Sequence, residues 1–410
     1  MEFYPYKAGK SKASIYGSQR GKTIYKTTGY KEVMIYDGVS NESYRQVVKN
    51  HKRRIRQESI SVSHTSLRAQ VKQEGTAIEN EIQKICQSTF EEYNITSEDN
   101  CYDQIEISPV KLEKEALIKQ AFEEVKQDAP KAIRGILKLD YSSYEDASKT
   151  VNISVDDVCS NRQKTTRIKG KKREEKKYIP RRKNGKKNYP KRKKLFQTVV
   201  HLQSAKGSYA LYGEKVGFVI PQITAFLLKN TDQDKNWVFH VDGQRTLQDT
   251  ISIKFGWKNI KLILDWYHLR KKINYELNMG VHRNEMKDEI LTTLEQLAWY
   301  GLTEQAIAYI KSIEVEQIKN IKNLETLAGY FKRNRENIPN YALRKKLGLR
   351  NSSNIGEKYN DLIVAKRQKN NGMSWTKPGA NSLGLIKMMN LNGETNTWLK
   401  EGKINFSWAA

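Results

Sequence analysis

Cysteine, histidine and long apolar runs are all scarce in this chain of 410 residues. The three cysteines, Cys86, Cys101 and Cys159, form no CxxC pair, and the six histidines form no HExxH motif. Disulfide frameworks and structural zinc sites need cysteines or histidines at short, regular spacings. We therefore expect neither, and this cysteine usage is typical of a reducing compartment.

No stretch of the sequence approaches the roughly 20 consecutive apolar residues that a membrane-spanning helix needs. The residues from Met1 to Lys10 include aromatic and charged side chains instead of the apolar core of a secretory signal. These two absences predict a cytoplasmic protein with no membrane partner.

Acidic residues are in the minority, with 46 Asp and Glu against 73 Lys and Arg, which gives a formal net charge of +27. Such a charge concentrates polyanions around a protein, so nucleic acid is the expected partner. A generic basic protein, such as a ribosome-associated factor, fits the charge equally well. Composition therefore indicates the class of partner but not the activity.

The first part of the chain divides into two regions. Residues 1–45 are rich in Tyr, Gly, Lys and Ser, with one strand-like stretch from Glu32 to Tyr36 and no long helical period. We expect a small N-terminal segment there. Residues 46–150 are expected to form a helical DNA-binding and connecting region.

A helix-turn-helix pattern begins that second region. Ser63 or Thr65 could N-cap a short helix that ends near Gly75, after an earlier basic helix. In helix-turn-helix geometry the second helix enters the major groove, where Arg68 and Lys72 would contact DNA. A plain basic helical hairpin is the alternative.

Strand-like runs dominate residues 151–265. They are Val151 to Asp157, Phe196 to Gln203, Tyr209 to Tyr212, Trp237 to Val241 and Ile260 to Leu264, with a helix from Val216 to Lys229 after the third run. The order is three strands, a helix, a strand, a helix and a strand. It matches the RNase H-like α/β sheet, in which an antiparallel meander leads into parallel strands.

A strongly basic segment separates the first two runs, since 18 of the 34 residues from Asn161 to Lys194 are Lys or Arg. Such a segment cannot bury a core and is expected to form a loop or arm. Each basic side chain placed against phosphate releases a counterion and strengthens binding. The expected contacts are Lys171, Lys172, Arg181, Arg182, Lys193 and Lys194. A solvated linker without a specific role is the alternative.

Helical periodicity extends through residues 266–348, which we expect to form an all-helical insertion in the α/β domain. Two of the strand-like runs before it end in acid: Asp156 and Asp157 end the first, and Asp242 ends the fourth. Carboxylates that converge on one edge of a sheet are the ligands a two-metal phosphoryl-transfer site needs. An acid at a strand end can equally form a turn or cap a helix.

Four blocks in residues 150–385 carry a resemblance to a known family. They are VDDVCSNRQ (Val155 to Gln163), HVDG (His240 to Gly243), LDWYHLRKK (Leu264 to Lys272), and NSSNIGEK with AKRQKNNGMSW (Asn351 to Trp375). In order and spacing they resemble the bacterial insertion-sequence transposases of the ISLre type. These are DDE enzymes, named for two aspartates and a glutamate, and are related to the eukaryotic Mutator-like elements.

The resemblance implies an RNase H-like domain in which Asp156, Asp242 and Glu357 bind two Mg²⁺ or Mn²⁺ ions. It implies metal-dependent cleavage and strand transfer at insertion-sequence ends. The partners would be double-stranded DNA, both terminal repeats and target, and further copies of the chain in a homodimer or higher assembly at the bacterial nucleoid. Residues 349–385 would contain the last acidic helix and 386–410 a C-terminal tail. The family often has a β-branched residue before the glutamate, where this chain has Gly356.

Several further residues are candidates for the site. Asp157, Asp265 and His268 are additional acid or base candidates, although Asp265 and His268 could instead hold a strand–helix junction. Further DNA contacts are expected at Arg270, Lys271, Arg367, Lys369 and Trp375, whose ring would stack on a base or pack in the core. Two other functions stay open: an inactive DNA-binding relative, and an RNase H-like nuclease without strand transfer.

Overall fold

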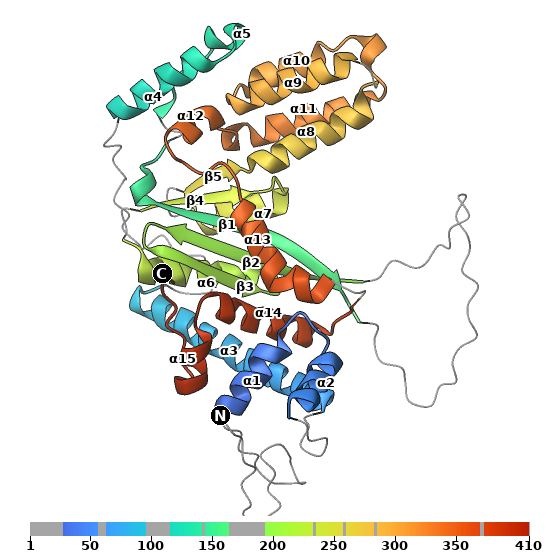
Figure 1. Ribbon diagram of the computed structural model, residues 1–410. Coiled ribbons are helices and arrows are strands. Elements are labelled where there is room, and N and C mark those ends of the chain that lie inside the picture. Colours follow the sequence, from blue (N-terminus) through green and yellow to red (C-terminus); the bar gives the residue numbers. More distant parts are fainter. Residues whose placement is uncertain are drawn as a thin grey trace, which may run out of the picture.

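The computed structural model describes residues 28–55, 63–95, 115–141, 144–163, 193–232, 235–256, 260–282, 285–369 and 373–409 (Figure 1). The basic-loop residues Lys171, Lys172, Arg181 and Arg182, and Cys101, lie outside them. Within these ranges no helix is long and apolar enough to cross a membrane.

A five-stranded mixed sheet with the order β3-β2-β1-β4-β5 lies at the centre. Its strands are β1 (Thr150–Asn161), β2 (Lys194–Ser204), β3 (Gly207–Gly213), β4 (Asn236–Val241) and β5 (Ile260–Leu264). The first three form an antiparallel meander, and β4 and β5 then add in parallel beside β1. The α/β class and the order of elements expected from the sequence are confirmed.

One hydrophobic core joins the sheet to helices from both ends of the described chain. These helices are α1 (Thr28–Gly38), α2 (Tyr44–Ile55), α3 (His64–Glu92), α6 (Val216–Asn230), α14 (Lys377–Leu391) and α15 (Thr395–Glu401). Helices α3 and α14 lie side by side below the sheet in Figure 1. The helix α7 (Arg245–Lys254) connects β4 to β5, and α13 (Asn354–Asn360) crosses in front of the sheet.

A second core lies in the helical block above β5 in Figure 1. It contains α8 (Trp266–Gly280), α9 (Glu285–Trp299), α10 (Thr303–Lys311), α11 (Ile321–Asn334) and α12 (Tyr341–Lys346), as expected for residues 266–348. The helices α4 (Glu115–Asp128) and α5 (Lys131–Arg134) also pack here, although they precede the sheet in sequence. The expected helical region 46–150 thus contributes to both cores.

The N-terminal helices differ from the sequence expectation in two ways. The strand-like stretch from Glu32 to Tyr36 lies within the helix α1. Ser63 does N-cap a helix, α3, as expected. However, α3 is 29 residues long and continues through Gly75 to Glu92, so it is not a short recognition helix. Position 75 of this helix needs a glycine, because α14 packs so closely that a Cβ there would lie 2.3 Å from the Ser382 Cβ.

Two other segments differ as well. The strand β1 continues past Asp156 and Asp157 to Asn161, because its pairing with β2 extends to that residue, so neither acid ends the strand. Residues 386–410, expected as a tail, contain the end of α14, the helix α15 and the fully buried Phe406. The Phe406 ring packs at 5.3 Å from the Phe226 ring, which explains why this segment is ordered against α6.

Candidate active site

The register of the sheet brings Asp156 and Asp242 to neighbouring positions. Ser154 on β1 is paired with His240 on β4, and the two strands run parallel. Each aspartate lies two residues further along its own chain, so both are on the same face as that pair. Neighbouring strands are only about 4.8 Å apart. The two carboxylates therefore come close because of strand pairing, not loop conformation.

Glu357 reaches this face on the helix α13, which packs directly on β1. A Cβ at Gly356 would lie 2.7 Å from the Ser154 Cβ, so the glycine permits this close approach. Asn360, one turn after Glu357, donates its side-chain amide to Asp156 Oδ2. The Tyr359 ring also packs at 4.3 Å from the His201 ring of β2. The absence of a β-branched residue at position 356 thus has a packing reason.

Asp265 and His268 connect the helical block to the site. Asp265 N-caps α8, where its Oδ1 accepts a hydrogen bond from the His268 backbone N–H at 2.8 Å. The same carboxylate accepts from the Ser353 hydroxyl at 3.0 Å, just before α13. The His268 ring lies between two acids, with Nδ1 3.1 Å from Asp265 Oδ1 and Nε2 3.6 Å from Glu357 Oε1. Asp265 therefore holds the strand–helix junction and also orients His268.

Electrostatic shifts mark the same cluster. Burial, together with the neighbouring Asp242 carboxylate, raises the pKa of Asp156 to about 6. The hydrogen bond to Asp265 raises the pKa of His268, and the nearby Asp242 and Glu357 act in the same direction. Two carboxylates placed together with a histidine beside them shift each other's pKa, and such perturbed groups are typical of functional sites.

Asp157 is less well placed than its neighbour. Successive residues of a strand point to opposite faces, and Asp157 accepts a hydrogen bond from the Thr198 hydroxyl at 2.5 Å, whereas Asp156 faces α13. Burial raises the pKa of Asp157 also. The structure thus favours Asp156 over Asp157 as the partner of Asp242 and Glu357.

Carboxylates are the hard oxygen ligands that Mg²⁺ and Mn²⁺ prefer. In the parts of the chain that the structure describes, no three Asp, Glu, His or Cys side chains converge closely enough to hold a metal ion. Glu357 is turned toward His268 and its side chain is 42% exposed. The Asp242 carboxylate contributes to the raised pKa of Asp156, so the two carboxylates repel each other. A bound cation would relieve this repulsion, and this is the observation that fits a metal site.

Four of the expected DNA contacts lie together, away from the acids. Arg68, Lys72, Arg367 and Trp375 all line one pocket. Trp375 is only 9% exposed and its ring lies against Arg367, so core packing, not base stacking, describes its position.

The remaining expected contacts are separate from one another. Lys193 and Lys369 are exposed, and Lys194 donates to Asn161 Oδ1 at 2.9 Å across the root of the basic loop. Arg270 pairs with Glu295 at 2.7 Å, and the Lys271 ammonium lies 5.8 Å from the centre of the Tyr267 ring.

Sequence reasoning missed Asn360 and Tyr330. Asn360 lies three residues after Glu357, a spacing that puts both on one helix face and could have identified it. Tyr330 comes from α11, and its hydroxyl lies 3.5 Å from the backbone O of Asp242 and against Gly243, whose φ is +84°. No local pattern links residue 330 to residue 242, because the helical block brings them together.

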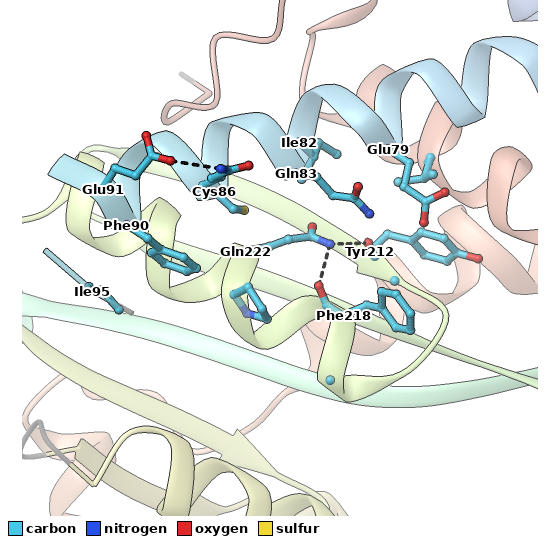
Figure 2. Close-up of a pocket in the computed structure, with 15 residues that line it drawn as sticks. Glu79, Ile82, Gln83, Cys86, Phe90, Glu91, Ile95, Tyr212, Phe218 and Gln222 are labelled. Carbon is cyan, nitrogen blue, oxygen red and sulfur yellow. Dashed lines mark hydrogen bonds between the residues drawn. The ribbon is translucent and has the colours of Figure 1, made fainter. Parts of the chain in front are cut away.

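A second cavity, between α3 and α6, is unsuited to phosphate chemistry (Figure 2). Its walls are largely apolar, with Cys86, Phe90 and Phe218 among them, and Glu79 and Glu91 at its edge would repel phosphate. The Gln222 amide in its wall donates to the backbone O atoms of Tyr212 and Phe218, at 3.1 Å and 2.9 Å.

Comparisons with family models, with curated proteins and with solved structures gave no match.

Proposed function

We propose that this protein is a DDE-type DNA transposase that cuts and joins DNA at the ends of an insertion sequence, using two Mg²⁺ or Mn²⁺ ions. One observation carries the proposal: Asp156, Asp242 and Glu357 come from β1, the end of β4 and α13 to one face of the sheet, around His268. These are the same three acids that the sequence resemblance selects.

The fold supports this proposal. A meander of three antiparallel strands followed by two parallel strands, in the order β3-β2-β1-β4-β5, is consistent with an RNase H-like domain. In this arrangement the helical block enters between β5 and α13. It therefore separates the first two acids from the third in sequence, while Asn360 of α13, three residues after Glu357, still contacts Asp156.

The metal ions would be held by Asp156 and Asp242, with Glu357 completing the set. When bound, they would lower the pKa of the attacking water or 3′-hydroxyl and stabilise the leaving oxygen during in-line displacement. Asn360 fixes the Asp156 carboxylate, and Asp265 fixes the His268 ring. His268 is a positioning residue here, because its Nε2 lies 3.6 Å from Glu357 Oε1 and would orient that carboxylate.

The positive charge of the chain supports DNA as the substrate. A net charge of +27 would draw duplex DNA to a site that is itself negative, and the surrounding Lys and Arg would neutralise the backbone. Assembly of two or more copies would let the protein hold two element ends and a target together.

The test is incubation of the protein with Mg²⁺ or Mn²⁺ and labelled linear DNA that carries the flanking element ends. We expect nicking and joining that Asp242→Asn and Glu357→Gln each reduce about a thousandfold or more, since each removes a metal ligand. Asp249→Asn is the matched control, because Asp249 is an exposed acid on α7.

Each other outcome identifies one of the alternatives. Nicking without joining, lost in the same variants, would indicate an RNase H-like nuclease. Salt-sensitive DNA binding with no cleavage by the unmodified protein would overturn the enzyme assignment and leave a DNA-binding relative.

A further inference from the structure

A pocket of about 500 Å³ lies between the N-terminal helices and the segment that follows α13. We call it the Arg367 pocket. Its walls come from α2, α3, the end of β1 and the turn before α14, and its residues include Tyr44, Arg45, Arg68, Lys72, Gln163, Arg367, Met373 and Trp375. Four of these side chains are cations, and none of the residues that line the pocket is Asp or Glu.

Arg367 is the unusual member of this pocket. It is 1% exposed, and its Nε is buried without a hydrogen-bond partner among the described residues. Its guanidinium lies 5.2 Å from the Tyr44 ring centre and 4.9 Å from that of Trp375, while Nη1 contacts the Met373 sulfur at 3.0 Å. A buried charge is costly when no opposite charge lies beside it.

The neighbours of Arg367 increase this cost. Arg68 and Lys72 are exposed residues one turn apart on α3 at the edge of the pocket, and Arg45 lies on α2. Arg367 and Lys366 both lower the pKa of Lys387, after burial itself, which shows how much positive charge gathers here. Within the described residues no carboxylate pairs with Arg367, so the pocket has positive charge that an anionic ligand would compensate.

Hydrogen bonds join the wall of the pocket to the end of β1. Trp375 donates its backbone N–H to the Asn161 carbonyl at 2.9 Å, and Gln163 donates its N–H to the Trp375 carbonyl at 2.8 Å. The Trp375 indole N–H donates to the Gln368 carbonyl at 3.1 Å. The two aromatic rings therefore hold the Arg367 guanidinium in one orientation, as a fixed fork that suits phosphate geometry.

We propose that the Arg367 pocket binds a phosphodiester group of DNA, with Arg367 as its buried anchor and Arg68 and Lys72 at its edge. This inference rests on the proposed function for the identity of the polyanion. The pocket lies at the end of β1, five residues and more beyond Asp156, where the basic loop begins. A phosphate held there would fix the path of the duplex relative to the acids, without itself taking part in the chemistry.

The sharpest test supplies Arg367 with an internal carboxylate. Met373→Glu would place an anion at the position of the sulfur that Arg367 now contacts, and Met373→Gln is the matched neutral control. Binding to a labelled duplex is measured by fluorescence anisotropy in EDTA, where no cleavage occurs. We expect Met373→Glu to weaken binding at least about tenfold and to raise the melting temperature relative to Met373→Gln.

The edge of the pocket is tested separately, in case the buried substitution prevents folding. Arg68→Ala and Lys72→Ala should each weaken duplex binding a few-fold. Each should also release about one counterion fewer on binding, which lowers the slope of log affinity against log salt concentration. Lys229→Ala is the control, because Lys229 is an exposed cation at the end of α6, outside the pocket.

Two results would overturn the proposal. They are equal duplex binding by Met373→Glu and Met373→Gln, and edge variants that bind the duplex as Lys229→Ala does. Failure of the proposed function is distinguishable. A protein that never cleaves DNA, yet loses duplex binding in Met373→Glu but not in Asp242→Asn, would retain the pocket and lose only the enzyme assignment.

Discussion

Two regions of this protein bury charge in opposite ways. Where the helical block meets the sheet, Arg344 of α12 and Glu145, which precedes β1, are both essentially inaccessible to solvent. They form a two-pronged ion pair, at 3.1 Å and 2.9 Å, which Lys261 of β5 joins at 3.1 Å. On the face of the sheet, Asp156 lies beside another carboxylate, and near the end of β1 Arg367 is buried with no acid beside it among the described residues. Charges that are paired internally hold the fold together, whereas unpaired ones remain available to a ligand.

The largest expected effect comes from breaking the paired region. Glu145→Gln would leave Arg344 buried without its carboxylate, the condition of Arg367, and should lower the free energy of unfolding by about 3–5 kcal/mol. Chemical denaturation measures the change. Glu124→Gln is the control, because the Glu124–Lys346 pair also involves α12 but joins it to α4 at the surface, and little change is expected there. Equal losses in the two variants would contradict the distinction between the regions.

A smaller effect is expected from separating α13 from the sheet. Gly356→Val would force its side chain against Ser154, and overpacking of this kind costs about 1–3 kcal/mol. Because Glu357 and Asn360 would move with the helix, cleavage should fall about a hundredfold. The DNA cleavage assay described above measures the loss of activity, and a denaturation curve measures the loss of stability. Gly329→Ala on α11, where a Cβ meets open space, should keep full cleavage. Unchanged cleavage by Gly356→Val would show that α13 need not pack so closely.

The smallest effect concerns two histidines that are buried in the neutral form. Burial lowers the pKa of His201 to about 4 and that of His240 to about 3, with nearby arginines acting in the same direction. The unfolded chain therefore binds more protons than the folded chain below about pH 6.5, so stability should fall as pH drops from there toward 4. His201→Gln should reduce this slope in denaturation curves measured across that range. An identical slope would show that His201 contributes nothing to acid sensitivity.

The sheet was predictable because each strand contains an apolar run, and the order of these runs alone indicated three antiparallel strands followed by two parallel ones. Asp242 and Glu357 were likewise selected from sequence blocks. The choice of Asp156 over Asp157 was not decided by periodicity, since only the packing of α13 distinguishes the two faces of β1.

The other differences share a physical cause, which is contact between segments far apart in sequence. The expectation of a short second helix was wrong. A glycine often ends a helix, but Gly75 lies inside α3, where α14 packs against it. The Arg367 pocket combines side chains from α2, α3 and the segment after α13, and no spacing in the sequence reveals that Arg367 lacks an acid. Tertiary packing, not local propensity, determined each of these features.

The bond between Asn360 and Asp156 spans 204 residues. Contacts at such separations form late during folding, because the loop they close costs entropy that local contacts do not. A partly folded chain would thus carry its positive charge from the start but would bring its third acid into place only at the end. Under the proposed function, this order of assembly would act as a safeguard, since a chain would hold DNA before it could cut it.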